Sequence, residues 1–221
     1  MAARIDQDVK RSDRFAFANT LYAAQGMISA GFFNSKIALL DFGCGQFFFS
    51  KHLKAFCNKI HGFDPYYEFK NCENDASLSC EISFFSAKEN LPKKTYDLIV
   101  LNSVLQYFND ASEVKSFLES ASFCLKEEKG KILIIDVMTP DYNLGLDLFW
   151  WLVFAIQKRV LFSLLRDLWM TAVVTQTHKK IFKIELTELE ELALNLGFHF
   201  KKMSRNCGPS RERYTILLEK I

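Results

Sequence analysis

The residues best suited to chemistry lie in a short glycine-rich segment, residues 39–46, with the sequence LLDFGCGQ. An apolar run leads into Asp41, and Gly43 and Gly45 follow at alternate positions. Glycines at this spacing let the backbone turn tightly and approach a ligand closely. A helix expected to begin near Phe48 would direct free N–H groups at a negatively charged group. The segment therefore predicts a loop that binds a ligand through its backbone.

A second acidic residue, Asp64, ends the next apolar run of the chain. A carboxylate at the end of the second strand of such a unit can accept both hydroxyls of a ribose. Together with Asp41 and the two glycines, it favours a nucleoside-containing cofactor over a plain α/β scaffold. A nicotinamide cofactor fits less well, because its Gly-x-Gly-x-x-Gly fingerprint needs a glycine where Phe48 stands.

Short apolar runs that alternate with helical patterns must position these residues. The expected strands are residues 36–41, 59–64, 80–85, 96–101, 131–137, 198–204 and 214–220. Capping-box spacing at Asp110 with Glu113, and at Thr187 with Glu190, predicts the starts of two helices, and Gly197 ends the second. This alternation is typical of an α/β fold, with a doubly wound, mostly parallel sheet covered on both faces.

Two segments fall outside the alternation. Residues 1–35 are expected to form an N-terminal helical cap on a domain that spans residues 36–221. Residues 139–183, inserted after the fifth strand, are rich in Phe, Trp and Leu and are expected to form a lid at the carboxyl ends of the strands. The apolar run at residues 148–157 is about half of the roughly 20 residues that a membrane-spanning helix needs. It predicts a buried helix, a substrate lid or a surface-dipping helix.

The lid is unusually aromatic, and side chains of this kind more often fill a core than contact a substrate. The aromatic residues are Phe149, Trp150, Trp151, Phe154 and Phe162. Their number on one inserted segment favours an apolar or aromatic substrate.

Five segments resemble, in order and spacing over residues 36–220, the successive motifs of class I S-adenosylmethionine-dependent methyltransferases. They are LLDFGCGQ, HGFDPYY, YDLIVLNSVLQYFND, KILIIDV and LTELEELALNLGF. The resemblance implies a Rossmann-like sheet of seven strands with the last antiparallel, and S-adenosyl-L-methionine across the ends of the first and fourth strands. It also implies a small-molecule acceptor, methylated directly at O, N or C as in natural product biosynthesis, with S-adenosyl-L-homocysteine as product.

By position, the resemblance implies a set of cofactor-binding residues. They are Asp41, Gly43, Cys44, Gly45, Asp64, Pro65, Ser86, Ala87, Asn102 and Ser103. The glycine loop would surround the methionine part, and Asp64 would hold the ribose hydroxyls. Ser86 and Ala87 fall near the place where the family often meets the adenine amino group with an acid followed by Ala.

The chain departs from the family pattern at Phe47, which stands where the third glycine of the loop is usual. A large side chain at a positive φ is strained and would crowd the loop. An altered pocket is therefore expected. The departure keeps open a methyltransferase-fold protein that binds the cofactor without methylating, either a cyclase-like enzyme or a non-catalytic binding subunit.

The transferable methyl belongs to the cofactor, so the sequence nominates a catalytic group less directly. If an acceptor hydroxyl must lose a proton, the candidates are Tyr107, Gln106 and His178. Asp136, at the end of the fifth strand, fits a turn acid as well as a role at the acceptor. His199 lies in a terminal strand and fits a structural or surface role.

Composition and charge exclude some classes of binding partner. The net charge of +2 and the absence of basic clusters argue against nucleic acid. The 6 cysteines match no zinc spacing, and no metal is expected. Residues 1–14 are charged and polar and look unlike a secretory signal, so we expect a cytoplasmic protein with reduced thiols. A lipid methyltransferase that touches membranes through the apolar lid is a further alternative.

Overall fold

The computed structural model describes residues 13–33, 35–66, 80–174 and 181–221. Its strands are β1 Ile37–Phe42, β2 Cys57–Phe63, β3 Glu81–Phe85, β4 Leu98–Asn102, β5 Lys131–Val137, β6 Phe198–Lys202 and β7 Tyr214–Lys220. Its helices are α1 Arg14–Ser29, α2 Phe48–Lys51, α3 Ala111–Cys124, α4 Leu144–Gln157, α5 Leu161–Val174 and α6 Leu186–Asn195, with short 3-10 turns η2 Lys54–Phe56, η3 Lys88–Asn90 and η4 Leu105–Tyr107. Every predicted strand is present, with bounds within two residues of those expected.

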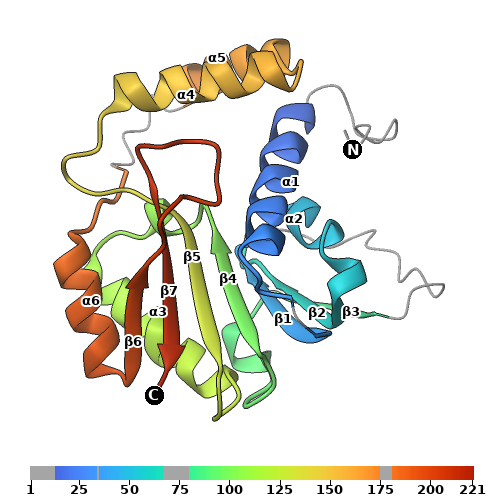
Figure 1. Ribbon diagram of the computed structural model, residues 1–221, viewed down its shortest axis with the longest axis vertical. Helices are drawn as coiled ribbons and strands as arrows, with labels where there is room; N and C mark the ends of the chain where they lie inside the picture. Colours follow the sequence, from blue (N-terminus) through green and yellow to red (C-terminus); the bar gives the residue numbers. More distant parts are fainter. Residues whose placement is uncertain (1–12, 34, 67–79, 175–180) are drawn as a thin grey trace.

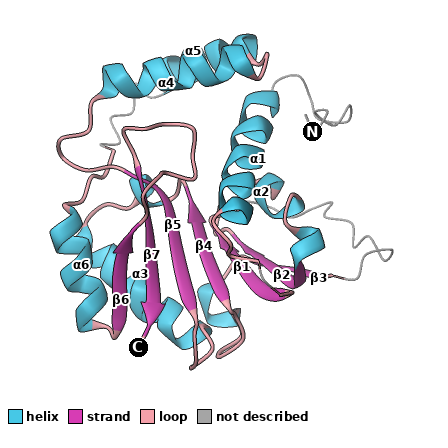
Figure 2. Ribbon diagram, in the orientation of Figure 1, coloured by secondary structure: helices cyan, strands magenta, loops and turns pink. Residues whose placement is uncertain are grey.

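The strands form one sheet in the order β3-β2-β1-β4-β5-β7-β6 (Figure 2). The first five strands pair in parallel, and β7 runs antiparallel to both β5 and β6. This confirms the predicted seven-stranded, doubly wound sheet. The chain reverses its direction of progress across the sheet between β1 and β4, and open α/β sheets bind ligands at the carboxyl ends of such neighbouring strands.

Helices cover both faces of the sheet. Successive residues of β1 point to opposite faces, so neighbouring side chains pack in two different cores. Leu40 packs with Phe117 of α3 and Leu189 of α6 in one core. Leu39 packs with Met27 of α1 and with part of α2 in the other. The expected N-terminal cap is therefore the helix α1, which lies against the sheet beside β1 (Figure 1).

Of the two predicted helix caps, the one at α3 is present and the one at α6 is not. At α3, Asp110 caps the helix as predicted and accepts from the amides of Ser112 and Glu113, while Glu113 reaches back to the amide of Asn109. At α6 the prediction was wrong. The helix begins at Leu186 after Glu185, with no side-chain cap, so Thr187 already lies within the first turn.

The predicted lid is the helical hairpin of α4 and α5, which lies across the carboxyl ends of β4 and β5 (Figure 1). Trp151 and Phe154 pack with Ala18 of α1 in a small separate core. Phe149 and Phe162 remain 53% and 66% exposed, so the expectation of a core role holds for only part of the aromatic set. No described helix is long and apolar enough to cross a membrane.

A buried ion pair ties this lid to the sheet. Arg213, immediately before β7, donates to both carboxylate oxygens of Asp147 in α4, at 3.0 and 2.7 Å. Tyr142 and Trp151 donate to the same carboxylate at 2.6 and 2.9 Å. Burial raises the pKa of Asp147, but its hydrogen bonds and the charge of Arg213 outweigh burial and hold that pKa below its usual value.

Candidate functional site

The glycine loop between β1 and α2 has left-handed backbone at alternate residues. Gly43, Gly45 and Phe47 have φ angles of 79°, 45° and 61°. A Cβ at Gly43 would lie 2.5 Å from a methyl carbon of Val104, so both conformation and space require glycine there. At Gly45 a Cβ would meet nothing within 4 Å, so this turn faces open space in which a ligand can approach the backbone.

Phe47 adopts a left-handed conformation, the positive φ at which strain was expected for a large side chain. A non-glycine residue in this conformation costs roughly 1–2 kcal/mol. Its ring is 3% exposed and contacts Phe84 edge-on with 4.7 Å between ring centroids. Burial of this ring offsets the backbone cost.

Asp64 follows β2 directly and is tied to the glycine loop. Its Oδ2 atom accepts from the amide of Gly45 at 3.0 Å, and its Oδ1 atom accepts from the amide of Tyr66 at 2.9 Å. A carboxylate oxygen has two lone pairs, so each oxygen retains capacity for a further donor. The arrangement holds an acceptor group rigidly beside the loop.

Asp41, the last but one residue of β1, is only 1% exposed and accepts a 2.7 Å hydrogen bond from the hydroxyl of Ser50 in α2. Burial raises the pKa of Asp41 to about 7, Ser50 opposes this rise, and the charge of Asp64 adds to it. A nearby cation would favour the ionised form. The site thus contains a carboxyl group that responds to a positively charged ligand.

Two cavities meet at the carboxyl ends of β1 and β4, and both are lined by Gly43 and Asn102. The larger, of about 710 Å³, is also lined by Asp64, Pro65 and Ser103. The smaller, of about 210 Å³, adds a second group from the loop and from helix α1: Asp41, Cys44, Gln46, Ala16 and Thr20. The structure therefore brings seven of the ten predicted cofactor residues into one region, and Gly45 joins them through its hydrogen bond to Asp64.

Ser86 and Ala87 line neither of these two cavities. They follow β3, where Ser86 is exposed, and the next residue, Lys88, lies in the wall of the larger cavity. Lys88 was not predicted, and neither were Ala16 and Thr20 of α1. Contacts between α1 and the glycine loop arise only in the folded chain, so no local sequence motif predicts them.

Asn102 offers a buried hydrogen-bond acceptor to a ligand. Its Oδ1 atom is buried and, within the described residues, has no hydrogen-bond partner, although such atoms are normally paired. Ser103, the next residue, donates a 2.6 Å hydrogen bond to Asp136, which also accepts from Asn206. Asp136 is 1% exposed, so these contacts support its reading as a turn acid at the end of β5.

The three candidate proton acceptors lie in different places. Tyr107, in η4, is 62% exposed and lines the larger cavity. Gln106, beside it, lines neither of the two cavities, and its side-chain oxygen accepts from Arg213 at 3.5 Å. His178 lies outside the described residues.

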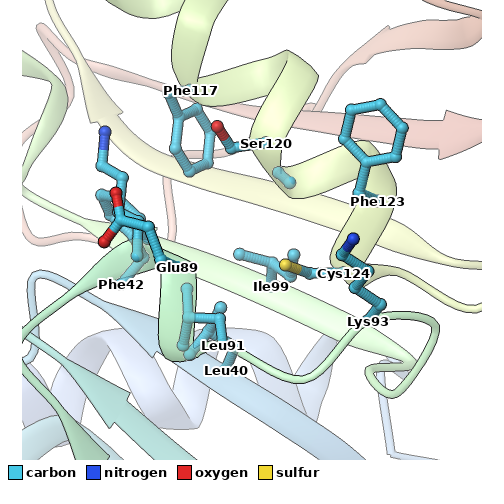
Figure 3. A pocket seen from close by; sticks show the side chains of 12 residues that line it. Leu40, Phe42, Glu89, Leu91, Lys93, Ile99, Phe117, Ser120, Phe123 and Cys124 are labelled. Carbon is cyan, nitrogen blue, oxygen red and sulfur yellow. The ribbon is translucent and has the colours of Figure 1, made fainter.

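A third cavity, of about 280 Å³, lies between α3 and the sheet (Figure 3). Leu40, Ile99 and Phe117 form its apolar floor and wall, with Phe123 and Lys93 at its edge. None of the predicted site residues lines it. The candidate site is therefore the pair of cavities at the glycine loop.

Comparison with known proteins decides the family. A family model described as a methyltransferase domain matches residues 11–200. The chain belongs to this methyltransferase family. It is an S-adenosylmethionine-dependent methyltransferase, as the five motifs implied. No curated protein sequence matches it significantly.

Solved structures share the fold of this methyltransferase at low sequence identity. Magnesium protoporphyrin IX methyltransferase from Synechocystis PCC 6803, with bound S-adenosylhomocysteine, is 14% identical with a TM-score of 0.54, over 99% of this chain and 89% of that chain. Human N-acetylserotonin methyltransferase is 16% identical with a TM-score of 0.59, over 96% and 56%. The 1,6-didemethyltoxoflavin-N1-methyltransferase from Burkholderia thailandensis is 13% identical with a TM-score of 0.55, over 92% and 78%.

The residues of this methyltransferase fit the cofactor of its family. Asp64 retains acceptor capacity for hydroxyl donors, and the Oδ1 atom of Asn102 awaits a donor. Asp41 is a buried carboxyl group whose ionisation a cationic ligand would favour. In the described part of the chain, no group of three or more His, Cys, Asp or Glu side chains is placed to hold a metal ion.

Proposed function

We propose that this methyltransferase transfers a methyl group to a small apolar or aromatic molecule, at an O, N or C atom. The observation that carries this proposal is the aromatic character of the larger cavity where it meets η4. Tyr107 and Phe108 line it there, and Phe42 and Phe63 line it from the strand ends. Aromatic walls favour flat or apolar acceptors, because such ligands bury well against ring faces. A role in natural product biosynthesis agrees with an acceptor of this kind.

The protein's own contribution is to bind and align. Asp64 would accept hydrogen bonds from the ribose hydroxyls of the cofactor, Asn102 would accept one from a donor where the two cavities meet, and Asp41 would stabilise positive charge. S-adenosylmethionine, when bound, supplies an electrophilic methyl group. Alignment of the acceptor with this methyl group, together with desolvation inside the larger cavity, would supply the rate gain.

Tyr107 is the candidate group for moving a proton. Of the two described candidates, Tyr107 is the one that lines the larger cavity. Its hydroxyl can take the acceptor's proton while it passes its own proton to water, so that the proton is relayed out of the site. Gln106 has an amide that cannot serve as a base, and we assign it the role of supporting η4 through Arg213. His178 stays a candidate base on sequence grounds.

A cytoplasmic location is part of the proposal. Four of the described cysteines, Cys57, Cys80, Cys124 and Cys207, are free and buried. Burial raises the pKa of the Cys57 thiol to about 12, which leaves it protonated and inert. Unpaired thiols of this kind are typical of a reducing compartment.

Methyl transfer from isotopically labelled S-adenosylmethionine to a panel of aromatic, aliphatic and charged acceptors tests the proposal. We expect label in apolar or aromatic acceptors and little in charged ones. With a good hydroxyl acceptor, Tyr107→Phe should lower kcat roughly 10- to 100-fold with KM nearly unchanged. Tyr66→Phe is the matched control, because Tyr66 lines the same cavity but is 95% exposed. Transfer only to charged acceptors, or no transfer by protein that binds the cofactor, would refute the proposal.

A further inference from the structure

The side of α4 that faces away from the sheet is apolar along its whole length. Its exposed large side chains are Leu144, Leu146, Leu148, Phe149, Leu152 and Ile156. The other exposed residues of this helix are Gly145 and Gln157. A surface helix of a globular protein normally carries charged and polar residues on such a side.

The second helix of the hairpin, α5, continues the same surface. Phe162, Leu165, Leu168 and Trp169 are exposed, and together the ten side chains have exposed fractions from 39% to 69%. We call these ten residues the outer face of the lid. Ten large apolar side chains at this exposure on one hairpin are unusual, because soluble monomers rarely expose apolar surface of this extent.

The outer face is additional to the surface that the hairpin needs for folding. Trp151, Phe154, Ala155 and Leu164 point inward and pack in their own core against α1. None of the described helices or strands lies on the far side of α4 and α5 (Figure 1). Among the described residues, no helix or strand therefore covers the outer face.

The charges on the hairpin indicate the chemistry of that contact. Lys158 and Arg159 are exposed at the turn between the two helices, and Arg166 lies on α5 in a 2.9 Å salt bridge with Asp167. The remaining acid, Asp147, is 1% exposed and paired with Arg213. Three cations against one half-buried carboxylate, Asp167, leave an excess of two positive charges beside the apolar surface.

We propose that the outer face of the lid docks on an anionic lipid surface, with both helices lying in the plane of the interface. Leu, Phe and Trp on one face with Lys and Arg at its edge are the composition of interfacial helices, whose apolar side sinks about 5–10 Å into the headgroup boundary. Each helix has 14 residues, about 21 Å of length, which suits lying on a bilayer and not crossing it.

A second copy of this chain fits the outer face less well. A two-fold interface brings the same patch of both copies together. Both copies would then bring the excess positive charge of their hairpins into one interface, and on the described hairpin the half-buried carboxylate of Asp167 already pairs with Arg166. Anionic headgroups supply the missing negative charge.

Flotation of the full chain with lipid vesicles tests the proposal. We expect the protein to float with vesicles of phosphatidylcholine and phosphatidylglycerol, and less with phosphatidylcholine alone. The double variant Phe149→Gln, Leu152→Gln should weaken partitioning by roughly tenfold or more, because two half-exposed apolar side chains no longer enter the interface. Replacing Lys158 and Arg159 by Gln should weaken binding to anionic vesicles by a similar factor, and only at low salt.

Phe123→Gln is the matched control, because Phe123 is 66% exposed but lies near the end of α3, away from the lid. Equal partitioning of the control and the lid variants, or no flotation with anionic vesicles, would overturn the proposal. A dimer that dissociates in the Phe149, Leu152 variant without any vesicle binding would assign the face to a second copy. The proposal does not rest on the acceptor, and cofactor binding by the lid variants should equal that of the wild type.

Discussion

The amide of Gly45 donates a 3.0 Å hydrogen bond to Oδ2 of Asp64, so the loop after β1 and the acid after β2 form one unit. The same carboxylate holds the amide of Tyr66 through its other oxygen. Asp64 is thereby fixed before any ligand arrives. A preorganised acceptor of this kind binds a donor at little further cost in side-chain entropy.

Phe47 offers a direct measure of loop strain. Phe47→Ala should destabilise the fold by about 3–5 kcal/mol, because the buried ring is lost. Phe47→Gly should be less harmful than Phe47→Ala by roughly 1 kcal/mol, because glycine adopts a φ of 61° freely. Urea unfolding of both variants measures the difference. A glycine variant less stable than the alanine variant would contradict a strained loop.

Asp41 should make stability fall as pH rises. The folded protein holds the Asp41 proton more tightly than the unfolded chain, because its pKa is raised from 3.8 to about 7. The folded state therefore carries the extra proton between these values, and the free energy of unfolding decreases as pH increases through this window. Urea unfolding at about pH 5 and about pH 8 should show a smaller decrease in Asp41→Asn than in the wild type. An equal decrease in both proteins would refute the assignment.

Cofactor binding should release the proton of Asp41. A cationic ligand near this carboxyl favours its ionised form, so below a pH of about 7 binding and deprotonation are coupled. Calorimetry in buffers of different protonation enthalpy counts the released protons. We expect release by the wild type to be greater than by Asp41→Asn, and equal release by the two proteins would contradict the coupling.

The lid should depend on the pairing of Arg213 with Asp147. Arg213→Met leaves a buried carboxylate uncompensated and should cost about 3–5 kcal/mol in the free energy of unfolding. Adding Asp147→Asn should recover part of this loss, because the amide oxygen still accepts from Tyr142 and Trp151 while the buried charge is gone. Denaturant unfolding of the single and double variants tests this. Additive losses would show that the pair is not coupled.

Local pattern predicts this fold well wherever a strand is buried on both faces. β5 and β7 have the predicted bounds, since continuous apolar runs ended by polar residues leave little freedom of register. At α6 the pattern misleads. Thr187 has the spacing of a cap, but the cap position is Glu185, two residues earlier, so the Thr187 hydroxyl has no capping role.

The site is predicted less completely, because its remaining parts depend on distant contacts. The sequence locates Asp64 and Gly43, since each follows a recognisable strand. It does not show that Phe47 would adopt a left-handed conformation, because burial against Phe84 from another strand makes this affordable. Nor does it show the pairing of Asp147 with Arg213, which joins residues 66 positions apart.

Calorimetric titration with S-adenosylmethionine and S-adenosylhomocysteine tests most directly whether the unit of Gly45 and Asp64 is the cofactor site. The wild type should bind both, and Asp64→Asn should raise Kd by roughly 10- to 100-fold, the loss expected for hydrogen bonds to a charged acceptor. Asp97→Asn is the matched control, because Asp97 also accepts a backbone amide but lies at the opposite end of the strands. Its Kd should match the wild type. Binding that is equal in wild type and Asp64→Asn, or absent in the folded wild type, would contradict the assignment.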